Sequence, residues 1–298
     1  MQALKLSHVS KTYSNGVKAL DDISIEIKPG MFGLLGPNGA GKSTLMRTIA
    51  TLQEPDSGEL HLGEMNILED KMGLRRVLGY LPQDFGVYPK LSAEKLLHYF
   101  AQLKGIQSKK DRQKIVDFAL DVTNLSEVRN KSVAGYSGGM KQRFGIAQLL
   151  LNDPHLIIVD EPTAGLDPAE RHRFLNVLRD IGTDHIVILS THIVDDVKEL
   201  CTDMAVLNGG QLLNHRKPIE AIKELEGNIW NKVINKDELE AYSKTFDIIS
   251  RNYNQDHSLN IRVFSNEKPD ETFNVIQPDL SDVYFVSLKM DETETSNV

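Results

Sequence analysis

Hydrophobic and polar residues alternate in the N-terminal part of the chain, and this pattern predicts strands over residues 3–35. In Ile23-Ser-Ile-Glu-Ile27 every second residue is apolar, which is typical of a strand with one buried face. A second, shorter pair of strands is predicted around Glu59–Leu62. Gly79–Gln83 predicts a further strand that ends at a polar residue. This part of the chain should therefore be rich in β-structure.

The pattern changes to a helical period from Ser92 to about Leu125. Ser92 is a favourable N-cap, and Gly105 is a typical residue at which a helix stops. Further along, Leu156–Val159 and Ile186–Leu189 are continuously apolar and have helical stretches beside them. Such runs predict buried parallel strands.

The C-terminal third of the chain carries shorter patterns. Met204–Leu207 and Gln211–Leu213 flank an Asn-Gly-Gly segment, which predicts a β-hairpin. After the linker-like Glu226-Gly-Asn228, strand-like pieces occur at Leu259–Phe264 and at Val283–Leu288.

The residues after 290 are polar and acidic, and we expect this tail to be disordered. The chain should therefore divide into a large domain at 1–226, an accessory domain at 227–290 and a disordered tail at 291–298.

Composition excludes several classes of protein. The hydrophobic content of 40% allows a sizeable core, and the net charge of −8 disfavours a nucleic-acid partner, for which a basic stripe is expected. The single Cys201 cannot form an intrachain disulfide, which fits a cytoplasmic protein. No signal peptide is visible, and the apolar runs are far shorter than the roughly 20 residues of a membrane span.

The strongest motif follows the apolar segment Met31–Leu35 and precedes a predicted helix at Ser43–Ala50. It fits Gly-x-x-x-x-Gly-Lys-Ser/Thr, the loop whose backbone N–H groups and helix N-terminus form a nest for phosphates. Lys42 can reach the β- and γ-phosphates, and the Ser43 hydroxyl can ligate Mg²⁺. The predicted nucleotide-binding residues of this loop are Gly36, Pro37, Asn38, Gly39, Ala40, Gly41, Lys42, Ser43 and Thr44.

Two carboxylates end the apolar strand at Leu156–Val159. Asp160 can hold Mg²⁺ directly or through water, and Glu161 can polarise an attacking water. The alternative is a solvated acid pair at a strand end, which the phosphate loop makes the weaker interpretation.

A second candidate anion site lies at Ser137-Gly138-Gly139, where a helix is predicted to begin. Two chains arranged head to tail, each completing the other's site, would explain two such sites. An ordinary capped helix is the alternative.

These motifs, in this order, resemble the nucleotide-binding subunit of an ATP-binding-cassette (ABC) transporter over residues 1 to about 226. The resemblance implies an α/β P-loop NTPase of the ABC type with an antiparallel β subdomain and a helical subdomain at about 87–140. The segment from 227 to 290 would then be a small C-terminal α+β accessory domain.

The resemblance also implies roles for single residues. Gln83 matches the glutamine loop, which contacts Mg²⁺ and water and senses the membrane partner. Asp167 matches the aspartate that contacts the opposite subunit, and His192 matches the switch histidine that holds the γ-phosphate. Tyr13 matches the aromatic residue that stacks on adenine, and Glu161 matches the general base.

The chain departs from the usual Leu-Ser-Gly-Gly-Gln signature, because Tyr136 and Met140 flank Ser137-Gly138-Gly139. This variant resembles the branch whose separate ATPase subunits serve exporters, as does Gln277–Phe285 near the C-terminus. Phe85–Leu91 resembles the groove that receives a permease helix, although Tyr88 and Leu91 could equally be core residues.

The resemblance thus implies an ATP- and Mg²⁺-dependent ATPase that forms a homodimer and powers an exporter. Its partner would be a separate integral membrane permease, and its place the cytoplasmic face of the membrane. The alternative is a soluble ABC ATPase without a transporter, acting in DNA repair, chromosome structure or translation. A GTPase is disfavoured because Asn235-Lys-Asp-Glu238 misses the guanine-reading motif by one position.

Overall fold

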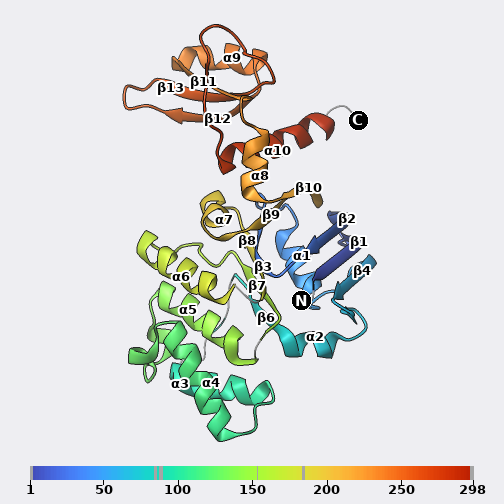
Figure 1. Cartoon of the computed structure of the whole chain (residues 1–298), viewed down its shortest axis with the longest axis vertical. Coiled ribbons are helices and arrows are strands. Elements are labelled where there is room, and N and C mark those ends of the chain that lie inside the picture. The colour runs from blue at the N-terminus through green and yellow to red at the C-terminus, as the bar shows by residue number, and fades with distance from the viewer. Residues whose placement is uncertain (1–2, 84–85, 87–89, 153, 183–184, 296–298) are drawn as a thin grey trace.

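The computed structural model describes residues 3–83, 86, 90–152, 154–182 and 185–295, which form three sheets and the helices that connect and flank their strands (Figure 1). The central sheet has six strands in the order β10-β9-β3-β8-β7-β6. Its strands are β3 (Gly30–Leu35), β6 (Leu78–Leu81), β7 (Leu156–Asp160), β8 (Ile186–Thr191), β9 (Asp203–Asn208) and β10 (Gln211–Arg216). All pairs are parallel except β9 with β10, the predicted hairpin.

The register of this sheet positions the site. Leu35 of β3 pairs with Thr191 of β8, and Asp160 of β7 pairs with Ser190 of β8. Every residue of β7 and β8 is buried, as their continuous apolar runs predict. The carboxyl ends of β3, β7 and β8 therefore lie side by side, and the segments that follow them share one edge of the sheet.

A second, antiparallel sheet has the order β2-β1-β4-β5. Its strands are β1 (Leu4–Thr12), β2 (Lys18–Ile27), β4 (Ser57–Leu62) and β5 (Met65–Asn66). In β2 the predicted alternation is confirmed, because Ile23, Ile25 and Ile27 are buried whereas Ser24 and Glu26 are exposed. Helix α1 (Lys42–Ile49) packs between this sheet and the central one, and their apolar side chains form one core cluster.

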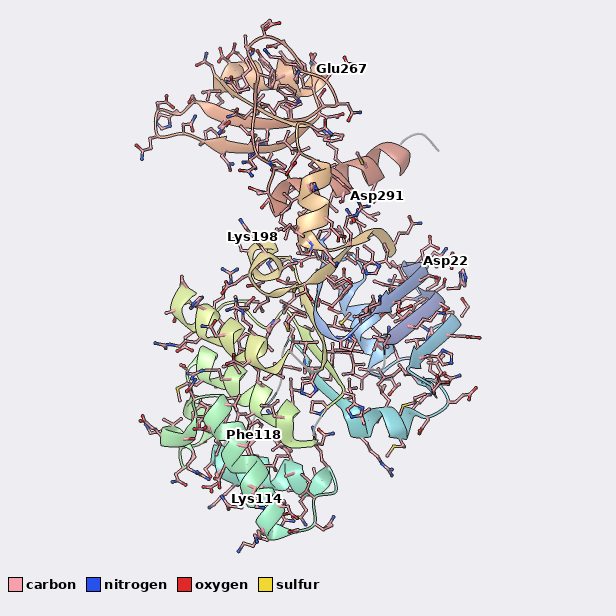
Figure 2. The ribbon with its side chains drawn as sticks, viewed as in Figure 1. Asp22, Lys114, Phe118, Lys198, Glu267 and Asp291 are labelled. Carbon is pink, nitrogen blue, oxygen red and sulfur yellow. The ribbon has the colours of Figure 1, made fainter. Side chains whose placement is uncertain are left out.

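Helices α3 (Ala93–Leu103), α4 (Lys109–Val122) and α5 (Gly138–Leu149) form the end of the molecule that carries Lys114 and Phe118 (Figure 2). The Ser92 hydroxyl accepts from Lys95 N, and Gly105 follows the helix with a φ of 94°, so the predicted cap and stop are confirmed. The remaining helices before residue 227 are α2 (Lys71–Val77), α6 (Pro168–Ile181), α7 (Val194–Leu200) and α8 (Pro218–Glu224). Short 3₁₀ turns occur at Ser126–Val128, Val133–Gly135 and Leu150–Asn152.

The C-terminal part, which carries Glu267 in Figure 2, has its own sheet in the order β12-β13-β11-β14. Its elements are β11 (Ile229–Ile234), a 3₁₀ turn at Lys236–Glu238, α9 (Leu239–Thr245), β12 (Ile248–Tyr253), β13 (Leu259–Phe264), β14 (Asn274–Val275) and α10 (Leu280–Thr295). The predicted strand at Leu259–Phe264 is confirmed. Alternate residues of β13 join Phe273 in a separate core.

Two predictions for the C-terminus are wrong. Val283–Leu288 lies in helix α10 and not in a strand, because the buried Leu280, Val283 and Tyr284 have helical spacing. A short apolar run does not by itself distinguish the two. The tail predicted to be disordered, residues 291–298, is helical over residues 291–295, where α10 continues, and residues 296–298 lie outside the described residues. Asp291 accepts a hydrogen bond from Asn208 Nδ2 at 2.8 Å, a tertiary contact that composition does not reveal.

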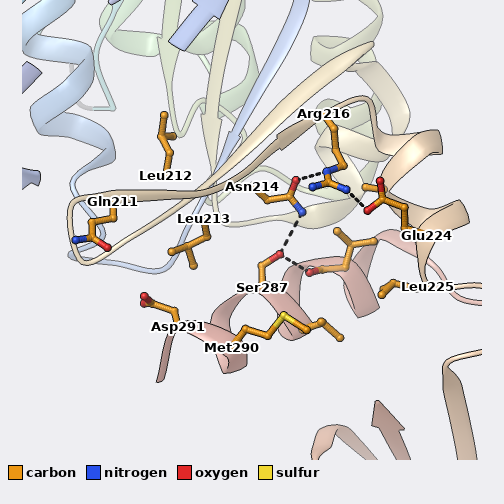
Figure 3. A pocket seen from close by; sticks show the side chains of 13 residues that line it. Gln211, Leu212, Leu213, Asn214, Arg216, Glu224, Leu225, Ser287, Met290 and Asp291 are labelled. Carbon is orange, nitrogen blue, oxygen red and sulfur yellow. Dashed lines mark hydrogen bonds and ion pairs between the residues drawn. The ribbon is translucent and has the colours of Figure 1, made fainter. Parts of the chain in front are cut away.

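Helix α10 lies against β10 and α8, with a groove of about 410 Å³ between them (Figure 3). Asn214 of β10 donates to Ser287 of α10 at 3.5 Å and accepts from Arg216 Nε at 2.7 Å. Apolar side chains of α8, α10 and the central sheet form a shared cluster. The C-terminal helix is therefore packed on the hairpin edge of the central sheet.

Candidate active site

The phosphate loop connects β3 to α1. Gly41 is the N-cap of α1 with a φ of 106°, and a Cβ there would lie 2.3 Å from the Ala19 carbonyl oxygen. Both the left-handed backbone and the close approach require glycine. The first N–H groups of a helix have no intrahelical partners, so those at the start of α1 are donors for an anion.

Lys42 is the charged group of this loop and is 5% exposed. Its ammonium donates to Gly36 O at 2.7 Å and to Pro37 O at 3.1 Å. It also lies 3.4 Å from Glu161 Oε1. The carbonyls and the carboxylate compensate the buried charge, and the oxygens of an entering phosphate would compete for the same donors.

Glu161 follows β7 and is the centre of the cluster. Its Oε2 lies 3.4 Å from both Gln83 Nε2 and His192 Nδ1. Its φ is 47°, a left-handed conformation that costs a non-glycine residue roughly 1–3 kcal/mol. The backbone is held there by hydrogen bonds from Glu161 N to Ser190 O and from Ala164 N to Glu161 O. The fold thus brings Lys42, Gln83, Glu161 and His192 together from four distant segments.

Asp160 is 4% exposed, and its Oδ1 is a buried atom without a hydrogen-bond partner in the described part of the chain. Leaving a buried carboxylate oxygen unpaired costs free energy. The Asp160 carboxylate, the Ser43 hydroxyl and the Gln83 amide carbonyl are all oxygen donors, the ligand type that Mg²⁺ prefers. These residues therefore fit a magnesium ion. Burial and, next, the charge of Asp160 raise the pKa of neighbouring Tyr80.

Tyr13 follows β1 and lines the cleft of the phosphate loop. Its hydroxyl lies 3.2 Å from Thr44 Oγ1 and donates to Gln53 Oε1 at 3.2 Å. Gln53 in turn donates to Thr44 O at 3.0 Å, which fixes the ring relative to α1. The cleft, of about 430 Å³, is lined by Tyr13, Val17, Ala19, residues 38–44, Gln83 and Glu161. Sequence reasoning missed Gln53, since a polar residue in a loop carries no signal for this contact.

Ser137 and Asp167 cap two adjacent helices. The Ser137 hydroxyl accepts from Met140 N at 3.2 Å at the start of α5. Asp167 accepts from Glu170 N at 2.9 Å at the start of α6. Ser137, Gly138 and Asp167 are exposed, whereas Gly139 is buried against Glu170. None of these four residues is among those that line the cleft of Lys42, so one copy of the chain does not join the two predicted anion sites.

The two departures from the usual signature have structural explanations. Met140 packs against the core cluster of the helical part, and Tyr136 is buried. The Tyr136 hydroxyl donates to Val128 O at 2.8 Å, and burial raises its pKa. The predicted permease groove lies mostly outside the described residues, which include Leu91 but not Phe85 or Tyr88.

Comparison with known proteins identifies the family. The chain is 33% identical over 240 residues to the uncharacterized ABC transporter ATP-binding protein YxlF of Bacillus subtilis, with 80% of this chain and 79% of the relative aligned. The chain belongs to the ATP-binding subunits of ABC transporters. The model of the ABC transporter family matches residues 20–164. The chain is also 36% identical over 230 residues to the Nod factor export ATP-binding protein I of Rhizobium etli, covering 76% of this chain and 72% of that one.

Solved structures agree with this membership. The structure of cbiO1 from Clostridium perfringens, part of the ABC transporter complex cbiONQ, matches with a TM-score of 0.69 and 29% identity over 74% of this chain and 90% of that one. The ATP-binding cassette MJ0796, solved as a dimer in a post-hydrolysis state with ADP and Pi, matches with a TM-score of 0.65 and 27% identity over 72% and 98%. The chain is therefore an ABC ATPase that binds ATP.

In this family the ATP-binding proteins dimerise and work with membrane permeases as partners. Among the helices of the described residues, none has the length and apolar composition of a membrane span.

Proposed function

We propose that this ATPase forms a head-to-tail homodimer around two ATP molecules with Mg²⁺ and powers export through a separate integral membrane permease. The observation that carries the proposal is the contrast between the two predicted anion sites. Lys42, Gln83 and Glu161 line one cleft and His192 contacts Glu161, whereas Ser137 and Gly138 are exposed and lie outside that cleft. A second copy would bring the second site to the first.

In this proposal Lys42 and the N–H groups of residues 39–44 hold the β- and γ-phosphates, and Tyr13 stacks on adenine. Ser43, Gln83 and Asp160 would hold Mg²⁺, which when bound neutralises charge on the phosphate oxygens. The unpaired Oδ1 of Asp160 and the oxygen-rich donor set support that assignment.

Glu161 is the proposed general base. The carboxylate takes a proton from water as the water oxygen attacks the γ-phosphorus and the bond to the β-phosphate oxygen breaks, which releases ADP. Its Oε1 is 3.4 Å from the Lys42 ammonium. Phosphate oxygens that attract Lys42 would leave this carboxylate free to accept a proton. His192, 3.4 Å from Oε2, is placed to hold the γ-phosphate beside the attacking water.

Ser137, Gly138 and Gly139 of a second copy would close the site from the γ-phosphate side, and Asp167 would contact that copy near the same place. The exposure of Ser137, Gly138 and Asp167 supports this arrangement, as does the dimeric state of the similar cassette MJ0796.

The proposed direction of transport and the proposed location rest on the relatives. Several similar proteins are named Nod factor export ATP-binding proteins, which supports an exporter rather than an importer. ATP-binding proteins of this family work with permease partners, which supports a separate permease and a place for this subunit on the cytoplasmic face of the membrane. Co-purification with ribosomes instead of membranes would favour a soluble ABC ATPase.

The full chain with Glu161→Gln tests the proposal. Without a base the variant should bind ATP but not hydrolyse it, and it should elute as a dimer only with ATP and magnesium. Turnover should fall by about 10²–10⁴, the usual contribution of a positioned base. Glu220→Gln, an exposed change on α8, is the control. Near-normal turnover would remove Glu161 from its role, and a monomer at high concentration with ATP would refute the dimer.

A further inference from the structure

Asp196 of α7 is a completely buried carboxylate that the proposed chemistry does not use. Its Oδ2 accepts from Thr163 Oγ1 at 2.6 Å and from Thr191 Oγ1 at 3.3 Å. Its Oδ1 accepts from Arg171 Nε at 2.7 Å. A buried carboxylate is costly unless it is paired and hydrogen-bonded, and these three donors meet both conditions.

The three donors come from three segments that carry predicted site residues. Thr163 lies two residues after Glu161, and Thr191 lies directly before His192. Arg171 lies in the first turn of α6, which Asp167 caps. One carboxylate therefore ties together the segments after β7 and β8 and the start of α6.

Geometry shows why the segment after β7 needs such an anchor. Glu161 has a left-handed backbone that only surrounding contacts can maintain. On the N-terminal side of this residue, Glu161 N donates a hydrogen bond to Ser190 O of β8. On its C-terminal side, the Thr163 hydroxyl donates a hydrogen bond to Asp196. The backbone is therefore held on both sides of Glu161.

The segment after β8 is held by the same group. The Thr191 hydroxyl accepts from Ile193 N at 3.0 Å and donates to Asp196, and these bonds bracket His192. The separation of 3.4 Å between Glu161 Oε2 and His192 Nδ1 thus depends on two segments that share Asp196 as their anchor.

We infer that Asp196 is a positioning residue for ATP hydrolysis. Through Thr163 and Thr191 it fixes the position of the Glu161 segment relative to the His192 segment. The inference rests on the roles proposed above for Glu161 and His192. Arg171 neutralises the Asp196 carboxylate and connects it to α6, the helix that Asp167 caps. Asp196 is buried and does not line the cleft, so it acts through Glu161 and His192.

The test removes one hydroxyl at a time from the full chain. Thr163→Val deletes the bond to Asp196 at nearly constant volume, and Thr163→Ser restores the hydroxyl. Thr123→Val is a matched control, because Thr123 is also buried but donates to Ala119 O at the C-terminal end of α4. Phosphate release gives kcat and KM, a fluorescent ATP analogue gives Kd, and thermal unfolding reports stability.

We expect Thr163→Val to lower kcat by about tenfold to a hundredfold, the cost of a small misplacement of reacting groups, while Kd changes by less than about threefold. Thr163→Ser should recover most of the activity, and Thr123→Val should lose stability but not kcat. If Thr163→Val turns over as fast as Thr163→Ser and Thr123→Val, the positioning role is wrong. Glu161→Gln in the same assay tests the base itself, so failure of the anchor and failure of the base are distinguishable.

Discussion

Gly139 allows Glu170 of α6 to approach the start of α5. A Cβ at position 139 would lie 2.2 Å from Glu170 Oε2 and 2.6 Å from its Cδ. The backbone of Gly139 is not left-handed, so alanine is disfavoured there by this contact alone. Gly139→Ala must therefore displace the carboxylate of Glu170.

The destabilisation caused by Gly139→Ala depends on the ion pairs that Glu170 would lose. Its carboxylate lies 3.5 Å from Arg143 Nη2 and 2.9 Å from Arg173 Nη1. Arg173 is largely exposed and contributes little, whereas the Arg143 side chain is only 10% exposed. Losing that contact costs about 1–3 kcal/mol, and alanine recovers at most about 1 kcal/mol of helix propensity. We expect Gly139→Ala to lower the free energy of unfolding by about 1 kcal/mol.

A double-mutant cycle with Glu170→Ala isolates this contact. In the Glu170→Ala background, Gly139→Ala meets no carboxylate and should be neutral or stabilise by up to about 1 kcal/mol. Urea unfolding should be followed by circular dichroism. The single tryptophan, Trp230, lies in β11, so its fluorescence reports the C-terminal sheet. Equal destabilisation by Gly139→Ala in both backgrounds would refute the reasoning.

Two further changes test the cleft and the helical part. Lys42→Ala removes the ammonium that faces the phosphate loop, so ATP retention on filters should fall at least about tenfold, and retention equal to wild type would contradict the assignment of the loop. Hydrogen bonds from Arg129 lower the pKa of Glu94 and the pKa of Asp117, whose ordinary values are 4.5 and 3.8. These bonds therefore stabilise the fold fully above the ordinary pKa values, and this stabilisation is lost as the pH falls through the lowered pKa values of the folded protein. Arg129→Met should therefore lower the free energy of unfolding near neutral pH and have less effect toward about pH 3, and a difference from wild type that stays constant over an acid titration would contradict this.

Local motifs predicted much of the site because they impose their own geometry. A glycine-rich loop between a buried strand and a helix can adopt few backbone conformations. The predicted loop is found between β3 and α1. The position of Asp160 follows from equally simple rules, since parallel strands end at one edge of a sheet. Ser92 and Gly105 marked the ends of a helix through capping and backbone preference.

Contacts between distant residues were not predictable in this way. Gln53 orients Tyr13 and Asp196 anchors Thr163, although neither polar residue stands in a motif. The helical state of Val283–Leu288 depends on packing against the central sheet, which a short apolar run cannot indicate.

The sequence by itself determined which groups are available for chemistry, because a phosphate loop, a strand-end carboxylate pair and helix caps are read from neighbouring residues. Only the tertiary structure decided which of these groups meet. It places Lys42, Gln83 and His192 around Glu161 and leaves Ser137 outside the cleft that Lys42, Gln83 and Glu161 line. The physical reason is that these distances depend on sheet order and packing between segments far apart in the chain, and no local pattern encodes them.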